Sequence, residues 1–140
     1  AGGHASLVLQ HFPHVTLLGV DQDPQILEHA QRALAPFGRR VRVRRGRMSQ
    51  LDALLDREAP QRVVGVLFDL GASSLQLDNG ARGFSFLADG PLDMRMDPER
   101  ERTAADIVNG WDEQDLADLF FYEGGETRSR KIARAIVDSR

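Results

Sequence analysis

Apolar and polar positions along the first half of the chain follow two alternating periods, which predict strands separated by helices. Residues 15–20 and 63–69 are short apolar runs rich in valine and leucine, and such runs are typical of strands buried on both faces. Residues 41–45 alternate valine with arginine, a pattern that predicts an edge strand. Apolar residues at helical spacing predict helices over residues 5–12, 24–34 and 49–57.

Capping residues mark where two of these helices begin. Asp23 precedes Pro24, and this pair is typical of an N-cap followed by the first helical position. Ser49 is the expected cap of the helix that follows it. Because strands alternate with helices, we expect an α/β fold with a doubly wound parallel sheet, in which residues 15–20 and 63–69 are the central strands.

The second half of the chain has a different pattern. From residue 71 to about residue 98 the sequence has no clear period and many Gly, Asp and Ser residues, and a loop of that length in a compact domain is usually functional. From Thr103 onward the pattern is helical, and Thr103 with Asp106 resembles a capping box. We therefore expect one domain over residues 1–102 and a helical one over residues 103–140. Its helices are expected over residues 104–109, 113–122 and 126–138.

Composition excludes several classes of function. The net charge is −3, so no global basic field indicates nucleic-acid binding. The sequence contains no cysteine, which excludes disulfides, thiolate metal sites and cysteine nucleophiles, and we identify no metal-ligand cluster. No signal peptide is visible and no apolar run approaches the ~20 residues that span a bilayer. We therefore expect a cytoplasmic protein or, alternatively, one of the mitochondrial matrix, with no membrane partner. The missing initiator methionine and C-terminal capping glycine indicate a fragment.

A glycine turn and an acidic residue suggest a nucleoside site near the N-terminus. Gly2, Gly3 and His4 precede the first helix, where a backbone without side chains can approach a ligand. Asp21 ends the next strand about 20 residues later, the position from which a carboxylate holds ribose hydroxyls. Met48 lies in the turn that follows the strand expected over residues 41–45 and is suited to pack on adenine. The alternatives are an ordinary turn, a helix-capping Asp21 and a core methionine.

A polar loop follows the apolar run 63–69, where open parallel sheets bind ligands. The sequence Gly71-Ala72-Ser73-Ser74-Leu75 lacks the second glycine of a nucleophile elbow, so a nucleophilic serine is disfavoured. The polar side chains of this loop are Asp69, Ser73, Ser74, Gln76 and Asp78.

Aromatic and basic residues have two interpretations each. Phe84 and Phe86 either stack on a base or pin the loop to the core. An arginine cluster either contacts phosphates or reflects the preferred cation of a chain in which Lys131 is the only lysine. The cluster comprises Arg39, Arg40, Arg42, Arg44, Arg45 and Arg47.

Charged and apolar residues alternate between residues 92 and 97. This alternation predicts one polar face, with Asp93, Arg95 and Asp97, and one buried face of leucine and methionine. An arginine between two carboxylates is most often part of a structural ion-pair network.

A family resemblance rests on segments that occur in a fixed order along the whole chain. They are GGH, DQDP, LFDLGASSLQLD, RGFSF, DGPLDMRMD, TAADIVN and RKIARAIV. Together they resemble the RsmH (MraW) family of S-adenosylmethionine-dependent cytosine-N4 methyltransferases of small-subunit ribosomal RNA. The resemblance implies a class I (Rossmann-like) methyltransferase sheet, truncated here, with the start of an inserted helical domain. It also implies that the first strand lies upstream of this chain and that later strands lie downstream.

The resemblance also implies roles for individual residues. Phenylalanine is usual where this chain has Met48, and proline where it has Leu75. From the chemistry of the reaction we hypothesise that Asp69 or Ser73, with backbone carbonyls of residues 70–74, accepts protons from the cytosine amine; the alternative is that Asp69 is committed to the cofactor. The fragment alone is not expected to be active. The partner is small-subunit ribosomal RNA, and the alternative function is a non-catalytic nucleotide- or RNA-binding module in ribosome assembly. The implied cofactor contacts are Gly2, Gly3, His4, Asp21, Met48, Asp69 and Gln76.

Overall fold

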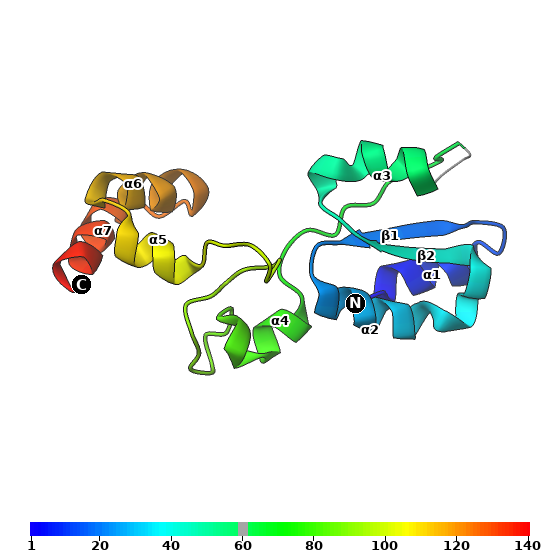
Figure 1. Ribbon diagram of the computed structural model, residues 1–140, viewed down its shortest axis with the longest axis horizontal. Helices are drawn as coiled ribbons and strands as arrows, with labels where there is room; N and C mark the ends of the chain where they lie inside the picture. The colour runs from blue at the N-terminus through cyan, green and yellow to red at the C-terminus, as the bar shows by residue number, and fades with distance from the viewer. Residues whose placement is uncertain (59–61) are drawn as a thin grey trace. The chain divides into compact units, whose positions relative to one another are not determined.

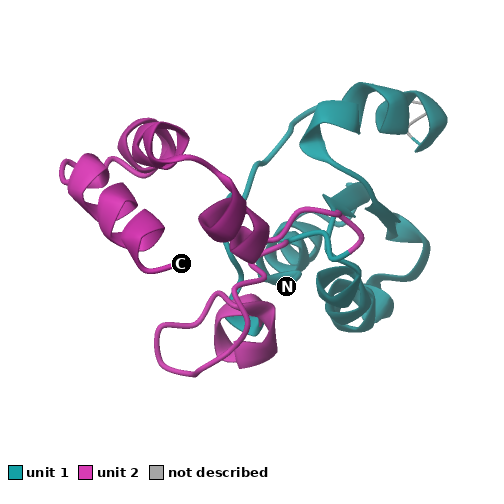
Figure 2. Cartoon of the chain, turned by 60° about the vertical axis from the view of Figure 1, so that its left-hand side comes forward, with its two compact units in different colours: residues 1–75, 96–98 teal, residues 76–95, 99–140 magenta. Residues whose placement is uncertain are grey.

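The computed structural model describes residues 1–58 and 62–140. These residues form two compact units (Figure 2). Unit 1 contains residues 1–75 and 96–98, and unit 2 contains residues 76–95 and 99–140. This division does not test the predicted domain boundary after residue 102, which stays a prediction. No helix in the described part of the chain is long and apolar enough to cross a membrane.

Unit 1 is built around a two-stranded parallel sheet. β1 pairs with β2 so that Leu17 aligns with Val41 and Asp21 with Arg45, which places the carboxyl ends of both strands side by side. Figure 1 shows α1 and α2 on one side of the sheet and α3 on the other. The elements are α1 (Gly3–His11), β1 (Leu17–Asp21), α2 (Pro24–Leu34), a 3₁₀ turn (Ala35–Arg40), β2 (Val41–Arg45), a second 3₁₀ turn (Met48–Gln50) and α3 (Leu51–Glu58). An α/β unit with a parallel sheet is thereby confirmed, whereas the wider doubly wound sheet stays a prediction.

Local capping determines how α2 begins. The Asp23 side chain accepts a hydrogen bond from the Gln25 N–H at 2.9 Å, and Pro24 occupies the first helical position. This confirms the predicted cap. The apolar side of α2 packs with α1, and the buried apolar residues of this unit are Leu9, Ile26, Leu27 and Leu34.

The predicted cap at Ser49 is wrong. Ser49 lies inside the 3₁₀ turn Met48–Gln50, and this turn runs directly into α3. Arg47 has the extended N-cap conformation, and its backbone N–H donates to the Gln50 side chain at 3.2 Å. A residue inside a helical turn cannot adopt the non-helical backbone that an N-cap requires.

The predicted central strand over residues 63–69 is also wrong. The only strands among the described residues are β1 and β2, and residues 62–70 are irregular. Val64 is 87% exposed and Leu67 is 69% exposed. An apolar run becomes a buried strand only when neighbouring strands complete its hydrogen bonds and other elements cover both faces. Neither condition is met here, and β1 is likewise half-buried in a two-stranded sheet rather than central.

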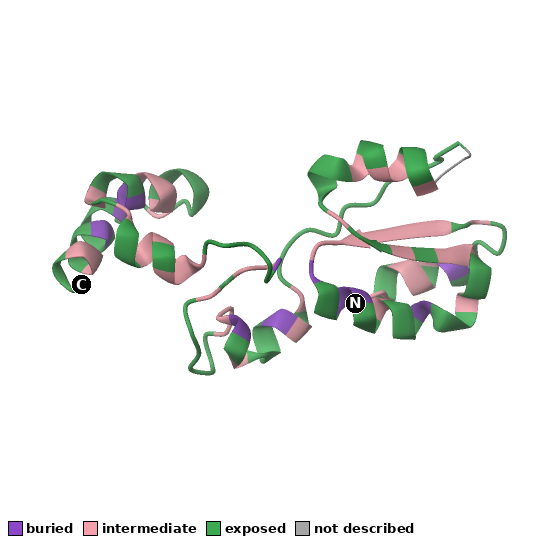
Figure 3. Ribbon diagram, viewed as in Figure 1, coloured by how far each residue is buried: buried purple, intermediate pink, exposed green. Residues whose placement is uncertain are grey.

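Unit 2 gathers its core between two short helices. The α-helical part of the predicted helix 113–122 ends at Asp118 and continues as a π-helical turn. Figure 3 shows buried positions on the facing sides of α6 and α7. The core comprises Leu116, Ala117 and Ala133, with Ile107, Trp111, Phe120, Ile136 and Val137 packed against them. The elements are α4 (Ser74–Asp78), which begins in unit 1, a 3₁₀ turn (Gly80–Arg82), α5 (Ala104–Gly110), α6 (Glu113–Asp118), the π-helical turn (Leu119–Glu123) and α7 (Ser129–Asp138).

The predicted capping box at the start of α5 is confirmed. The Thr103 hydroxyl accepts from the Asp106 N–H at 3.2 Å, and the Asp106 carboxylate accepts from the Thr103 N–H at 2.8 Å. These reciprocal bonds satisfy two backbone donors that helix geometry leaves without partners.

Candidate functional site

Asp21 stands at the carboxyl end of β1, as the sequence predicts. Its Oδ1 accepts from the Asp23 N–H at 2.9 Å, and its main-chain oxygen accepts from the Gly46 N–H at 3.0 Å. Asp23 is fully buried at the cap of α2, whereas Asp21 is only half-buried. The two aspartates therefore have different surroundings, and Asp21 is the one that a ligand can reach.

The glycine turn before α1 has the geometry that its sequence indicates. Gly2 has φ 84° at the N-cap of α1, a left-handed conformation that favours glycine. A Cβ there would lie 3.5 Å from the Leu34 side chain and 3.6 Å from that of Ala33. Gly3 opens α1, and apart from its chain neighbours and the backbone of its own helix no atom of the described residues lies within 4 Å of the position that its Cβ would take. The backbone of this turn is therefore fixed by glycine at one position and open at the next.

His4 and Asp69 meet across 65 positions of sequence. His4 Nδ1 lies 2.9 Å from Asp69 Oδ2, and the side chains are 65% and 74% exposed. An ionised carboxylate only accepts hydrogen bonds, so Nδ1–H is the donor. An exposed pair of this kind contributes little to stability. The contact brings His4 and Asp69 together, and the exposed Asp69 carboxylate is accessible to a ligand.

Met48 lies at the surface as the first residue of the 3₁₀ turn that follows β2. It is 59% exposed, so the alternative that it is a core residue is wrong. We find no hydrogen bond or ion pair, among the described residues, that joins Asp21 or Met48 to the His4–Asp69 pair. The sheet edge and the His4–Asp69 pair are thus two separate parts of the site in unit 1.

The remaining predicted site residues lie on and before α4. Ser73 is half-buried in unit 1, directly before the first residue of α4. Gln76 is 4% exposed and belongs to unit 2, so its place beside the other cofactor residues stays a prediction. Farther along, Phe86 is fully exposed whereas Phe84 is partly buried. The two phenylalanines, equivalent in sequence, therefore differ in their access to a base.

Five of the six clustered arginines bond to groups of the protein itself. Arg40 donates to the main-chain oxygens of Leu9, Phe12 and Val15 at 2.7, 3.0 and 3.2 Å, which satisfies a carbonyl in the last turn of α1 and two carbonyls of the segment after it. Arg42 and Arg44 both bond to Glu58, and the Arg44 guanidinium holds the pKa of that carboxyl below its usual range. Arg45 and Arg47 bond to Asp97. Intramolecular pairing, more than phosphate binding, accounts for this cluster.

The alternation over residues 92–97 has the opposite burial from the one predicted. Leu92 and Met94 are about half exposed, whereas Asp97 is only 8% exposed. Asp93 pairs with Arg95 at 2.6 Å, which lowers the pKa of the Asp93 carboxyl. Asp97 does not share Arg95 and pairs with β2 instead. Carboxylates with cationic partners can be buried. Ion pairing of the aspartates, more than the alternation of apolar residues, therefore determines which side chains of residues 92–97 are buried.

Arg82 is a buried residue that sequence reasoning missed. It is 8% exposed, and its Nη2 donates to the Arg95 main-chain oxygen at 2.7 Å. Met94 between these partners has φ 55°, and its N–H returns to the Arg82 main-chain oxygen at 3.0 Å. No local sequence signal marks such a contact, because the partner is a backbone carbonyl thirteen positions away.

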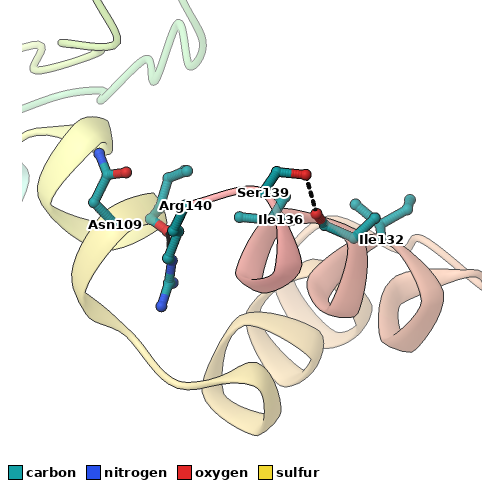
Figure 4. Close-up of a pocket in the computed structure, with 7 residues that line it drawn as sticks. Asn109, Ile132, Ile136, Ser139 and Arg140 are labelled. Carbon is teal, nitrogen blue, oxygen red and sulfur yellow. Dashed lines mark hydrogen bonds between the residues drawn. The ribbon is translucent and has the colours of Figure 1, made fainter.

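A groove of about 420 Å³ lies between α5 and α7 of unit 2 (Figure 4). The Ser139 hydroxyl at its rim donates to the Ala135 main-chain oxygen at 2.6 Å. None of the predicted site residues lines this groove. Its lining residues are Val108, Asn109, Ile132, Ala135, Ile136, Ser139 and Arg140.

Comparison with known proteins decides the family. The family model described as "MraW methylase family" matches residues 1–140. The chain belongs to the MraW methylase family. This confirms the resemblance that the sequence segments indicate.

Relatives in this family carry a common name. Ribosomal RNA small subunit methyltransferase H of Methylobacterium sp. (strain 4-46) is 46% identical over 140 residues, which cover 100% of this chain and 41% of that protein. The protein of the same name from Parafrankia sp. (strain EAN1pec) is 48% identical over 139 residues, covering 99% of this chain and 42% of that protein. The Syntrophobacter fumaroxidans protein of that name is 46% identical over 140 residues, or 99% and 44%. This MraW methylase chain therefore spans about two fifths of the length of the curated relatives it matches.

Proposed function

We propose that the complete protein transfers a methyl group from S-adenosylmethionine to the N4 amine of a cytidine in small-subunit ribosomal RNA. Membership in the MraW methylase family and the names of the relatives support this reaction class. The structural observation that carries the proposal is the hydrogen bond between His4 and Asp69. It joins two residues that the family resemblance assigns to one cofactor site, although the sequence separates them widely.

The residues of unit 1 fit the parts of this cofactor. Asp21 Oδ1 accepts from Asp23, and we assign Oδ2 to the ribose hydroxyls because a carboxylate accepts hydrogen bonds through both oxygens. Met48 offers an exposed apolar surface for adenine. The turn at Gly2 and Gly3 lets the backbone approach the ligand closely. Together these groups offer a carboxylate for the ribose, an apolar surface for the adenine and a turn at which the backbone can approach the ligand.

The transfer requires alignment more than a strong base. When bound, the cofactor supplies an electrophilic methyl group on a sulfonium sulfur. The cytosine amine is a poor nucleophile because its lone pair is delocalised into the ring. Its nitrogen forms the new bond to carbon as the sulfur–carbon bond breaks, and the amine then loses one proton. Asp69 Oδ1, the Ser73 hydroxyl and carbonyls of residues 70–74 are the acceptors that we assign to the amine protons.

His4 positions this acceptor in the proposed mechanism. Its Nδ1–H donates to one oxygen of Asp69, and in this proposal that bond favours carboxylate orientations in which the second oxygen is available to the amine. A fixed acceptor loses less entropy when the amine arrives than a mobile one. The target base has to leave its stack to reach the site, and the exposed Phe86 is the aromatic that we assign to hold it.

The broader setting follows the family resemblance. We propose a class I methyltransferase sheet completed by parts of the protein outside this chain, with residues 103–140 opening an inserted helical domain. We propose the cytoplasm as the compartment, with the mitochondrial matrix as the alternative.

The decisive experiment uses protein expressed from the complete reading frame that encodes this chain. The protein is incubated with methyl-labelled S-adenosylmethionine and small ribosomal subunits that lack the modification. We expect label on cytosine N4 with the parent protein and none with Asp21→Ala. Cofactor binding without label would refute the methyltransferase and favour a non-catalytic binding module. Label on another atom would refute the cytosine-N4 assignment alone.

A further inference from the structure

A cluster of polar contacts ties residues 96–98 to the carboxyl edge of the β1–β2 sheet. Arg45 Nη2 lies 2.7 Å from Asp97 Oδ1, and Arg47 Nη2 lies 3.3 Å from Asp97 Oδ2. Gln22 Nε2 donates to the Met96 sulfur at 3.6 Å. We call these three contacts the Asp97 clamp. All of its members belong to unit 1, although about 50 residues separate Asp97 from either arginine.

The clamp also ties the two strand ends to each other. Arg45 Nε donates to the Gln22 main-chain oxygen at 3.3 Å, so Arg45 contacts both the end of β1 and the 96–98 segment. Asp97 is 8% exposed. A carboxylate buried to this extent needs its cationic partners, since burying an unpaired charge is costly. Charge-assisted contacts are also shorter and stronger than neutral ones, so the clamp fixes local geometry firmly.

The members of the clamp are chain neighbours of the two residues that we assign to the nucleoside. Gln22 directly follows Asp21, the proposed ribose ligand, and Arg47 directly precedes Met48, the proposed wall of the adenine pocket. The Asp97 carboxylate therefore holds the end of β2 directly and the end of β1 through Arg45, which donates to Gln22. If this arrangement is lost, the ends of β1 and β2 can shift relative to each other, and the ribose contact of Asp21 and the adenine contact of Met48 are then altered together.

We propose that Asp97 is a positioning residue that sets the spacing between Asp21 and Met48 and thereby determines affinity for the nucleoside part of the cofactor. It acts through Arg45 and Arg47 and does not itself touch the ligand. This inference rests on the proposed function, because it takes Asp21 and Met48 as cofactor contacts.

The same strand offers a matched control. Glu58 at the end of α3 also pairs with two β2 arginines: its carboxylate accepts from Arg44, and its main-chain oxygen accepts from Arg42, whose guanidinium lies 3.8 Å from the carboxylate. The Arg44 Nε–Glu58 Oε1 distance is 2.6 Å, close to the 2.7 Å of the Arg45–Asp97 pair. Neither arginine is a chain neighbour of a residue assigned to the cofactor. Glu58→Gln therefore removes a comparable charge pair from β2 and leaves the two assigned contacts in place.

The test measures binding of S-adenosylhomocysteine and of 5′-methylthioadenosine by titration calorimetry, with the complete protein. Asp97→Asn keeps the shape of the side chain but removes its charge. We expect both ligands to bind about ten-fold more weakly, as is typical when a charge-assisted bond is lost. Glu58→Gln is expected to bind both within about two-fold of the parent. In the methylation assay, KM for the cofactor should rise by about the same factor as Kd while kcat stays within about two-fold.

Three results would overturn the proposal. Asp97→Asn could bind both ligands as the parent does, it could weaken only S-adenosylhomocysteine, or it could change affinity no more than Glu58→Gln. If Asp97→Asn does not fold, Arg47→Gln is tested instead, because it removes only the longer contact, between Arg47 and Asp97. Binding of both ligands by Arg47→Gln with the affinity of the parent would then overturn the proposal. Failure of the parent protein to bind S-adenosylhomocysteine would refute the proposed function instead, so the two failures are distinguishable.

Discussion

Two aspartates that are two positions apart provide a direct test of how this site is built. Asp23 is fully buried and caps α2, whereas Asp21 is half-buried at the end of β1 and accepts from the Asp23 N–H. We predict that a substitution at Asp23 changes stability but not cofactor affinity. A substitution at Asp21 is predicted to do the reverse.

The magnitudes follow from the contacts of each side chain. Asp23→Ala removes the cap of an eleven-residue helix, and loss of such a cap costs about 1–2 kcal/mol. Asp21→Asn keeps an Oδ1 acceptor for the Asp23 N–H, so we expect the free energy of unfolding to change by less than about 0.5 kcal/mol. In Asp21→Asn the proposed bonds from the ribose hydroxyls meet a neutral amide in place of a carboxylate. We expect this change to cost about 2 kcal/mol of binding free energy, or roughly thirty-fold in the Kd of S-adenosylhomocysteine.

The assay pairs urea unfolding with titration of S-adenosylhomocysteine, and uses the complete protein with each single variant. Amide hydrogen exchange in α2 reports whether a loss of stability is local to the Asp23 cap. Unchanged affinity in Asp21→Asn would refute the ribose assignment. If Asp23→Ala weakened binding as strongly as Asp21→Asn while α2 exchanged as in the parent, the separation of roles would be refuted.

Three further substitutions test the packing of unit 2. Leu116→Ala empties a fully buried core position and should cost about 3 kcal/mol, measured by hydrogen exchange of the α6 and α7 amides. Thr103→Ala should destabilise the start of α5 by about 1 kcal/mol. Hydrogen bonds from Thr103 lower the pKa of Asp106 in the folded protein. Protection of the first α5 amides from hydrogen exchange should therefore be complete above about pH 4, the ordinary aspartate pKa, and should decline as the pH falls through the lowered pKa of Asp106. Gly83→Ala should open the loop to protease, since Gly83 has φ 75° and its Cβ would lie 2.3 Å from the Pro91 oxygen; cleavage at the parent rate would refute this.

Apart from the cap expected at Ser49, the local features named next were predictable from the sequence of unit 1, because they depend on neighbours in the chain. The start of α2 at Pro24, its cap at Asp23 and the bounds of β2 agree with the sequence pattern. The end of β1 at Asp21 also agrees to within one residue. Each of these features is decided by backbone geometry and hydrogen bonds over a few residues, which sequence patterns report directly.

The strand expected over residues 63–69 shows where such patterns stop being sufficient. Valine and leucine content indicates that a segment can form a strand, but pairing with another strand decides whether it does. Within the described residues, β1 pairs only with β2, so Val64 and Leu67 stay exposed. Asp69 nevertheless contacts His4, because that contact requires only the end of the segment.

Charged pairs that form at long range were not predictable, and they account for most of what the sequence did not reveal about the site. The sequence 92–97 indicated an ion-pair network around Arg95, and the structure pairs Arg95 with Asp93 but pairs Asp97 with Arg45 at the end of β2 and with Arg47 just after it. Nothing in the sequence near Asp97 identifies partners about fifty positions away. The same pairing explains why an arginine-rich strand is not simply a phosphate-binding surface. Two carboxylates, Asp97 and Glu58, engage four arginines of this segment, so the arginines hold neighbouring segments against the sheet.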